Sequence, residues 1–208
     1  MEISVSILNS EDKKKIIKEL NNSTINYYHL DIMDGNFVSQ KALSLEEISE
    51  IIPISNKELD VHLMVSNPTK YIEYLGKIKL VTYITIHLEI DKEILNLIKK
   101  IKSYHKKVGI SIKPNTDINL LKPYLKYIDL ILVMTVEPGL GGQAFLENSP
   151  SRLHQIKQLI TGYDIQLEVD GGINNQTIKL VQEADIAVVG SYITTSDNPI
   201  MQISKLSA

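Results

Sequence analysis

The sequence predicts a compact (β/α)₈ barrel, the TIM-barrel class of α/β fold, formed as one domain over residues 1–208. Short apolar, β-branched runs alternate with amphipathic helical patterns from one end to the other, which is typical of βα units around a parallel sheet. Eight such units can be read in the chain, the number that closes this kind of barrel. No linker, repeat or low-complexity segment interrupts them.

An open, doubly wound sheet is the competing arrangement of alternating strands and helices. That fold usually carries a glycine-rich loop directly after its first strand. Here the corresponding stretch, SILNSED (6–12), contains no glycine. The barrel is therefore favoured, and its active site is expected on the loops that follow the carboxyl ends of the strands.

The predicted strands are short runs rich in Ile, Val, Leu and Tyr, the composition of strands buried on both faces. In chain order they cover Ile3–Leu8, Tyr27–Asp31, Leu59–Val65, Val81–His87, Lys107–Lys113, Ile128–Met134, Ile165–Val169 and Ile186–Gly190.

The predicted helices lie between these strands, where apolar residues recur at helical rather than alternating spacing. In chain order they cover Glu11–Asn21, Leu45–Ile51, Pro68–Leu75, Lys92–Tyr104, Ile118–Tyr124, Pro150–Ile160, Asn175–Gln182 and Pro199–Lys205.

Composition excludes several classes of protein. The hydrophobic and charged fractions, 43% and 23%, are those of an ordinary globular protein. No apolar run approaches membrane-spanning length and no secretory leader is visible, so a cytoplasmic protein without membrane partners is expected. The absence of Cys excludes disulfides, iron–sulfur ligation and thiol nucleophiles. Any metal ligands must therefore be His, Asp or Glu.

The balance of charges bears on the ligand. A net charge of −3 argues against a broad nucleic-acid footprint. The lysine runs 13–15 and 99–102 fall in helical patterns and are interpreted as solvated outer faces. Because Arg152 is the only arginine, we expect backbone amides to do much of the work of holding an anionic substrate.

Candidate site residues lie two residues apart at three predicted strand ends. Residues with this spacing share one face of a strand. The three sets are His29, Asp31 and Met33, then His62 and Met64, then Glu168 and Asp170. Since parallel strands of a barrel end at one mouth, His29, Asp31, His62 and Asp170 are predicted to form a divalent-metal site with N and O ligands.

Each of these residues also has a simpler interpretation when it is considered alone. His29 could be a hydrogen-bonded core histidine, and Asp31 could cap a turn. The occurrence of all four residues favours the metal site. Asp34, which precedes Gly35 in a common turn pair, is interpreted as turn-forming rather than catalytic.

Glycine-rich stretches follow the last three predicted strands. VMTVEPGLGGQAF (133–145) supplies flexible backbone and exposed amides that suit a lid or an anion cradle. The loops after strands seven and eight often bind phosphate in barrels of this class. A phosphorylated metabolite is the expected ligand, and the glycine-loop residues assigned to it are Gly139, Gly141, Gly142, Gly171, Gly172, Gly190 and Ser191.

The sequence resembles the ribulose-phosphate 3-epimerase family across nearly its whole length. The matching stretches, in family order, are SIL (6–8), HLDIMDGNFV, DVHLMV, ITIHLE, IKPNT, VMTVEPGLGGQAF, EVDGGI and VVGS. The resemblance implies a (β/α)₈ barrel in which the metal ligands are His29, Asp31, His62 and Asp170.

Other positions also take their expected roles from this resemblance. Asp31 and Asp170 match the acid/base pair, and Gly142, Gly172, Gly190 and Ser191 match the phosphate-binding loops. The remaining expected substrate contacts, some of them in the reaction centre, are Ser6, His62, Met33, Met64 and Met134.

The expected chemistry is epimerisation at a carbon beside a ketone. Two carboxylates on opposite faces suffice, one removing a proton while the other delivers one. A divalent metal would polarise the ketone oxygen and stabilise the enediolate. One ion per chain is expected, with zinc favoured and manganese, iron or cobalt as alternatives. The expected partners are a phosphorylated ketose and further copies of the chain in a homo-oligomer.

One loop departs from the family pattern. Where the family usually has a Pro-Asn-containing segment and a Gly-Pro step, this chain has FVSQKALSLEEI, and its segment Ser39–Ser44 is expected to border the active site. The leading substrates are D-ribulose 5-phosphate and D-xylulose 5-phosphate. The alternatives are an allulose-6-phosphate 3-epimerase or related ketose-phosphate epimerase, an aldolase using Lys113 as a Schiff-base nucleophile, and a non-catalytic sugar-phosphate-binding barrel.

Overall fold

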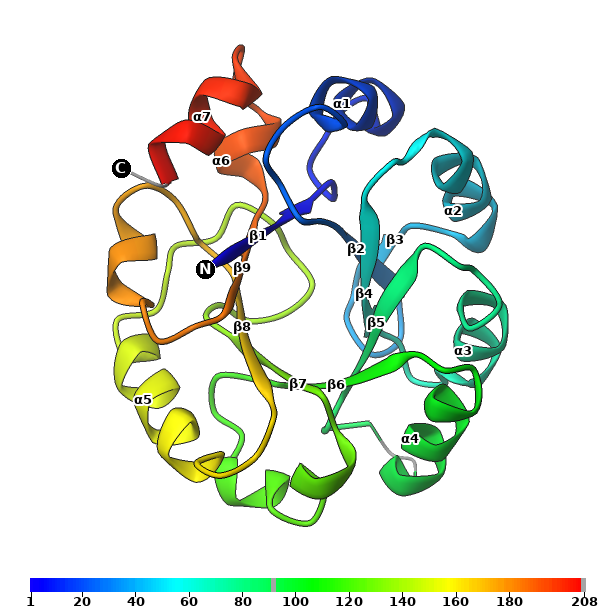
Figure 1. Cartoon of the computed structure of the whole chain (residues 1–208), viewed down its shortest axis with the longest axis vertical. Coiled ribbons are helices and arrows are strands. Elements are labelled where there is room, and N and C mark those ends of the chain that lie inside the picture. Colours follow the sequence, from blue (N-terminus) through cyan, green and yellow to red (C-terminus); the bar gives the residue numbers. More distant parts are fainter. Residues whose placement is uncertain (91–92, 207–208) are drawn as a thin grey trace.

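The strands close into a barrel in the computed structural model, which describes residues 1–90 and 93–206 (Figure 1). Within these residues the barrel has eight parallel strands, and β1 pairs with both β2 and β9 to complete the ring. The strands are β1 (Glu2–Ser6), β2 (Tyr27–Asp34), β4 (Glu58–Met64), β5 (Val81–His87), β6 (Lys107–Ile112), β7 (Leu130–Met134), β8 (Gln166–Asp170) and β9 (Ile186–Val189). The predicted fold class is confirmed.

A short additional strand, β3 (Lys41–Ala42), pairs antiparallel with the end of β2. The sequence pattern predicts no regular structure for this segment. β3 lies in the loop that departs from the family pattern, and Leu43 beside it has a φ of 46°. Ser44 then begins the next helix with a capping box, in which its side chain accepts from Glu47 N and Ser44 N donates to the Glu47 carboxylate.

The helices form the outer ring around the barrel (Figure 1). Their apolar faces pack inward, as Ile16, Ile17 and Leu20 of the first helix illustrate. The α-helices are α1 (Lys13–Leu20), α2 (Leu45–Ile51), α3 (Thr69–Leu75), α4 (Ile94–Ser103), α5 (Ser149–Leu159), α6 (Ser191–Thr194) and α7 (Pro199–Leu206), and η1 (Ile52–Ile54) is a 3₁₀ turn. Lys92, the predicted start of the fourth helix, lies outside the described residues.

Two predicted helices are 3₁₀ segments instead. The predicted helix Ile118–Tyr124 is replaced by η2 (Ile118–Leu121) and η3 (Leu125–Tyr127). These two segments are separated where Pro123 lacks the N–H that an α-helix needs. The predicted helix Asn175–Gln182 is replaced by η4 (Thr177–Leu180). Here the Asn174 side chain accepts from the backbone N–H groups of Gln176 and Thr177. Such side-chain bonds compete with regular helix hydrogen bonding.

The barrel strands divide their side chains between two environments. On β2, Leu30 and Ile32 point to the large apolar core beneath the helices. His29 and Asp31 alternate with them and so point to the barrel interior. A smaller apolar cluster also forms, from Tyr27, Tyr83, Leu130, Leu132, Met134, Val136 and Ile186. The period of two therefore places buried polar groups inside the barrel while the outer faces pack against helices.

Gly109 allows β5 and β6 to pack closely. It pairs with Thr85, and a Cβ at Gly109 would lie 2.1 Å from Thr85 Oγ1. We expect Gly109→Ala to lower the free energy of unfolding by about 1–3 kcal/mol, the usual range for overpacking a core, as measured by urea denaturation. Adding Thr85→Ala to the Gly109→Ala variant should recover part of the lost stability, because it removes the atom that the new Cβ would contact. The second change breaks no hydrogen bond, since Thr85 Oγ1 has no hydrogen-bond partner in the described structure. An unchanged unfolding midpoint for Gly109→Ala would contradict this account.

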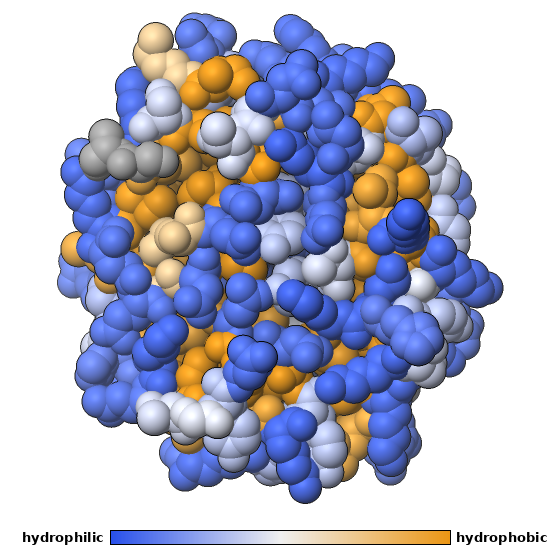
Figure 2. All heavy atoms as spheres, viewed as in Figure 1, coloured by the Kyte–Doolittle hydropathy of each residue, from blue (hydrophilic) through white to orange (hydrophobic). Residues whose placement is uncertain are grey.

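The surface view in Figure 2 shows a face covered mainly by hydrophilic side chains, with hydrophobic ones visible in several separate groups. Within the described residues, no helix has the length and apolar character that crossing a bilayer requires.

Candidate active site

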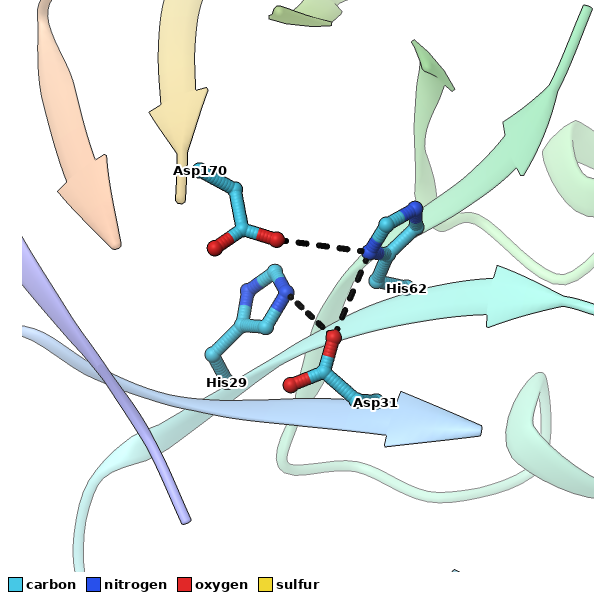
Figure 3. Close-up of side chains that lie close together, drawn as sticks. All are labelled: His29, Asp31, His62 and Asp170. Atoms are coloured by element: carbon cyan, nitrogen blue, oxygen red, sulfur yellow. Dashed lines mark ion pairs between the residues drawn. The ribbon is translucent and has the colours of Figure 1, made fainter. Parts of the chain in front are cut away.

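Three buried side chains and the partly buried Asp170 converge inside the barrel from three strands (Figure 3). His29 and Asp31 come from β2, His62 from β4 and Asp170 from the end of β8. Each offers a ligand atom, and these four atoms all lie within 4.8 Å of one another. The β2–β4 register pairs Asp31 directly with His62, so neighbouring strands present both groups at one level. The structure thus brings together all four residues that the sequence assigned to a metal site.

Asp31 Oδ1 lies between the two imidazoles. It is 3.4 Å from His29 Nε2 and 3.4 Å from His62 Nδ1, and His62 Nδ1 is 3.8 Å from Asp170 Oδ2. Neither nitrogen has a hydrogen-bond partner among the described residues, although both are buried. Buried polar atoms are nearly always paired, so two unpaired nitrogens aimed at one point indicate a missing ligand.

A divalent cation fits these donors. Ligands bonded at about 2.1 Å with tetrahedral angles stand about 3.4 Å apart, which is the separation that Asp31 Oδ1 keeps from both nitrogens. Two imidazoles and two carboxylates suit zinc and also admit manganese, iron or cobalt. The cluster could therefore hold a metal ion.

The other nitrogen of each imidazole is already hydrogen bonded. His29 Nδ1 lies 2.6 Å from Asp60 Oδ2, which also accepts from Ser4 Oγ. His62 Nε2 lies 2.9 Å from His87 Nε2. Such bonds orient ligand histidines and determine which nitrogen is free for a metal. Here they leave His29 Nε2 and His62 Nδ1 facing the cluster.

The two carboxyl groups have different electrostatic environments. Burial opposes ionisation of Asp31, but the adjacent His29 and His62 outweigh it and lower the pKa of Asp31. Burial, followed by the negative charge of Asp31, raises the pKa of Asp170 to about 6. Burial also disfavours the charged form of His29, yet Asp60 and Asp31 together raise the pKa of that imidazole well above its ordinary value. The environment therefore separates the two aspartates into a stronger and a weaker acid.

A cavity of about 640 Å³ opens onto Asp31 and Asp170. Of the residues that the structure describes, His29 and His62 do not line it, and the direct contact of His62 with substrate stays a prediction. The other substrate-site residues of the sequence analysis all line this cavity: Ser6, Met33, Met64, Met134, Gly139, Gly141, Gly142, Gly171, Gly172, Gly190 and Ser191.

The glycine-rich loops pack tightly around the cavity. Gly172 has a φ of 65°, and a Cβ there would lie 2.6 Å from Phe145 N. A Cβ at Gly141 would lie 2.3 Å from the Asn9 side chain, whose Nδ2 donates to Ser191 Oγ at 2.8 Å. Only glycine allows these loops to approach one another so closely. Backbone atoms of three separate glycine-containing loops therefore form one wall of the cavity.

No lysine or arginine lines the cavity within the described parts of the chain. Arg152 Nη2 instead donates to the carbonyls of Lys113, at 3.0 Å, and Thr116, at 2.5 Å. The Lys113 ammonium lies 4.5 Å from the ring centre of Phe37. An anion bound in the cavity would thus be held by backbone amides and hydroxyls, as the scarcity of arginine suggested.

Asp34 takes the turn role expected of it. Its Oδ1 accepts from Asn36 N at 2.8 Å and Phe37 N at 2.9 Å, and its Oδ2 accepts from Ser66 N at 2.8 Å. Gly35 follows with a φ of 78°, a conformation that favours glycine. Asp34 therefore anchors the loop after β2 and does not line the cavity with Asp31.

Four polar residues near the cluster received no role from the sequence: Asp60, His87, Glu89 and Glu168. Glu168 is completely buried, and burial together with the nearby Asp60 raises its pKa well above the ordinary value. The signal that could have identified His87 and Glu89 is the same alternate spacing, His-x-Glu at a strand end, that identified His29 and Asp31.

Comparisons with known proteins agree with these observations. A family model described as the ribulose-phosphate 3 epimerase family matches residues 2–194. A protein of Helicobacter pylori strain 26695, named ribulose-phosphate 3-epimerase, is 34% identical over 211 residues, which cover 99% of this chain and 96% of the relative. A Bacillus subtilis protein of the same name is 30% identical over 195 residues, covering 91% of this chain and 89% of the relative.

Similar solved structures share the fold at low sequence identity. 3-Hexulose-6-phosphate synthase from Salmonella typhimurium has a TM-score of 0.73 and 17% identity, covering 100% of this chain and 97% of that one. Orotidine 5′-phosphate decarboxylase from Pyrococcus horikoshii has a TM-score of 0.69 and 12% identity, covering 99% of both chains. At these identities the likeness extends to the barrel alone.

Proposed function

Because the chain belongs to the ribulose-phosphate 3-epimerase family, we propose that it is an isomerase that interconverts D-ribulose 5-phosphate and D-xylulose 5-phosphate. The observation that carries this proposal is the position of Asp31 and Asp170. Both carboxyl groups line one cavity, and they reach it from β2 and β8, which are separated in the barrel by β1 and β9. Inversion at one carbon needs two groups of this kind, approaching from different sides.

Asp31 and Asp170 act in this proposal as the acid and the base. One carboxylate removes the proton from the carbon beside the ketone, and the other carboxylic acid delivers a proton to the opposite face. The roles exchange when the reaction runs in reverse. Ser6 supports this role for Asp31, because its Oγ donates to Asp31 Oδ2 at 2.7 Å while Oδ1 is directed toward the histidines. Asp31 therefore uses Oδ2 to accept from Ser6 and directs Oδ1 toward the two histidines.

His29, Asp31, His62 and Asp170 would hold the metal in this proposal. A bound divalent cation would supply Lewis acidity, polarising the substrate ketone and stabilising the negative charge that develops when the proton leaves. Met33, Met64 and Met134 line the same cavity and exclude water from the reaction centre. The protein's own groups move the protons.

The substrate phosphate binds in this proposal to backbone amides of the loops that contain Gly142, Gly172, Gly190 and Ser191. We expect Gly190→Leu to weaken inorganic phosphate binding at least about tenfold, or about 1.4 kcal/mol, because the added side chain enters the cavity. The first atom of that side chain is tolerated, since a Cβ at Gly190 would make an ordinary 3.5 Å contact with Ser6. Isothermal titration calorimetry measures the effect.

The matched control for this prediction is Lys99→Ala, which removes a charge from the lysine-rich face of α4. Phosphate affinity should be unchanged in that variant, and metal content should be unchanged in both. Weaker phosphate binding by Lys99→Ala, with normal binding by Gly190→Leu, would move the anion site to the helix surface and contradict the assignment.

The decisive experiment for the proposed function is solvent deuterium exchange into ribulose 5-phosphate, with metal content measured on the same sample. Incorporation at C3 together with formation of xylulose 5-phosphate is the expected result. Faster turnover of allulose 6-phosphate in parallel assays would assign the hexulose-phosphate alternative. Sugar-phosphate binding without exchange, in metal-loaded protein, would identify a non-catalytic barrel.

A further inference from the structure

A series of hydrogen bonds runs outward from His62 through His87 to Glu89. His62 Nε2 lies 2.9 Å from His87 Nε2, and His87 Nδ1 lies 3.0 Å from Glu89 Oε2. Both imidazoles are completely buried. Their planes differ by 30° and their centres are 4.9 Å apart. His87 is therefore placed to control the proton on His62.

Glu89 determines which atom donates in each hydrogen bond of this series. Its other oxygen, Oε1, accepts from Lys113 N at 2.7 Å and from the hydroxyl of Thr116. Burial opposes ionisation of Glu89, but hydrogen bonds from His87, Thr116 and the Lys113 backbone outweigh it and lower its pKa to about 2. An ionised carboxylate only accepts hydrogen bonds. Consequently the proton between Glu89 and His87 resides on His87 Nδ1.

The contacts of His87 are met by a ring that carries one proton. The ring packs against Phe37, whose centre is 4.6 Å away, and the Lys113 ammonium lies over that same Phe37 ring. Among the described ion pairs, the carboxylate that faces His87 is that of Glu89, and it faces Nδ1. A neutral imidazole protonated on Nδ1 has a bare Nε2 that can only accept. The hydrogen bond between the two histidines must then be donated by His62 Nε2.

We propose that His87 and Glu89 are positioning residues that hold His62 in the tautomer with its proton on Nε2 and a bare Nδ1 facing the cluster. The opposite tautomer would place a proton on Nδ1, 3.4 Å from Asp31 Oδ1, at the point where a cation needs a lone pair. This inference rests on the metal site proposed above. In this proposal, His87 and Glu89 at the end of β5 determine which nitrogen of His62 is available to bind the metal.

The first test reads the tautomer directly and requires no ion. Long-range ¹H–¹⁵N correlation spectra of the metal-free protein should show His62 protonated on Nε2 and unprotonated on Nδ1. A proton on His62 Nδ1 in these spectra would overturn the proposal. Because this measurement uses the unaltered chain, it does not depend on whether any variant folds.

The second test compares two replacements of His87 by the zinc affinity of the protein, measured by competition with a chelator. His87→Leu removes the acceptor and should weaken zinc binding by about 10–100-fold, the usual cost of losing a partner that orients a ligand. His87→Gln should bind zinc nearly as well as the unaltered protein, because its amide oxygen can accept from His62 and its NH₂ can donate to Glu89.

His154→Leu is the matched control. His154 also pairs with a glutamate, its Nδ1 lying 2.8 Å from Glu183 Oε1, but this pair is exposed on the surface. Zinc affinity should not change in that variant. Equal losses in His87→Leu and His87→Gln would show that His87 acts by packing alone and would overturn the proposal, as would full zinc affinity in His87→Leu.

These experiments distinguish the failure of this inference from the failure of the metal site. If the unaltered protein does not bind zinc at the cluster, the proposed metal site is wrong, and the NMR spectrum still decides which nitrogen of His62 carries the proton. If zinc binds normally but His62 is protonated on Nδ1 in the metal-free protein, the metal site stands and the positioning role is wrong.

Discussion

Asp31→Asn and Asp170→Asn are each expected to lower the rate of epimerisation by about two to four orders of magnitude, the usual range for a positioned acid or base. Both carboxyl groups line the cavity, so each can reach the substrate from its own side. An amide retains the shape of the side chain but cannot exchange the proton. Coupled assays with ribulose 5-phosphate and xylulose 5-phosphate measure the loss.

The partial reactions of these variants identify each residue's face. Removing one carboxylate leaves the other able to exchange a proton on its own side of the carbon. Each variant that keeps its metal should therefore incorporate solvent deuterium into only one epimer, and the favoured epimer should be opposite in Asp31→Asn and Asp170→Asn. Metal content must be measured first, because both residues are also proposed ligands. Near-normal epimerisation by either metal-loaded variant would refute the two-base mechanism.

Removal of the metal is expected to lower epimerisation by about two to four orders of magnitude, because Lewis-acid stabilisation of the developing charge contributes several kcal/mol. Treatment with a chelator, followed by desalting and assay, measures the loss. Added zinc should restore both activity and a stoichiometry of one ion per chain.

His62→Ala tests where that ion binds. The variant should lose the metal and should not be restored by zinc at concentrations that restore the unaltered protein, because one of the two unpaired imidazole nitrogens is gone. His154→Ala, a replacement of an exposed histidine on α5, should retain both metal and activity. Full activity in protein that elemental analysis shows to be free of divalent metal would contradict the proposed role of the cluster.

Local sequence was sufficient for features that depend on short-range periodicity. Alternation along β2 separates His29 and Asp31 from Leu30 and Ile32, because successive strand residues point to opposite faces. The same rule predicted the strands, and the glycines and Asp34 predicted the turns. The sequence was less reliable for helices 118–124 and 175–182, where apolar spacing suggested α-helix. There Pro123 and the Asn174 side chain altered the hydrogen bonding that spacing alone does not describe.

The long-range resemblance to a family predicted which distant residues meet, and closure of the barrel brings them together. β2, β4 and β8 are far apart in the chain, yet His29, Asp31, His62 and Asp170 place their ligand atoms within 4.8 Å of one another.

The sequence by itself determined the residue types that can meet at the mouth of the barrel and the face of each strand on which they lie. Only the tertiary structure decided which nitrogen each histidine presents. His29 turns Nε2 to the cluster because Asp60 engages its Nδ1, whereas His62 turns Nδ1 because His87 engages its Nε2. The physical reason is that a hydrogen bond from a neighbouring strand depends on register, tilt and side-chain rotation, none of which a periodic pattern encodes.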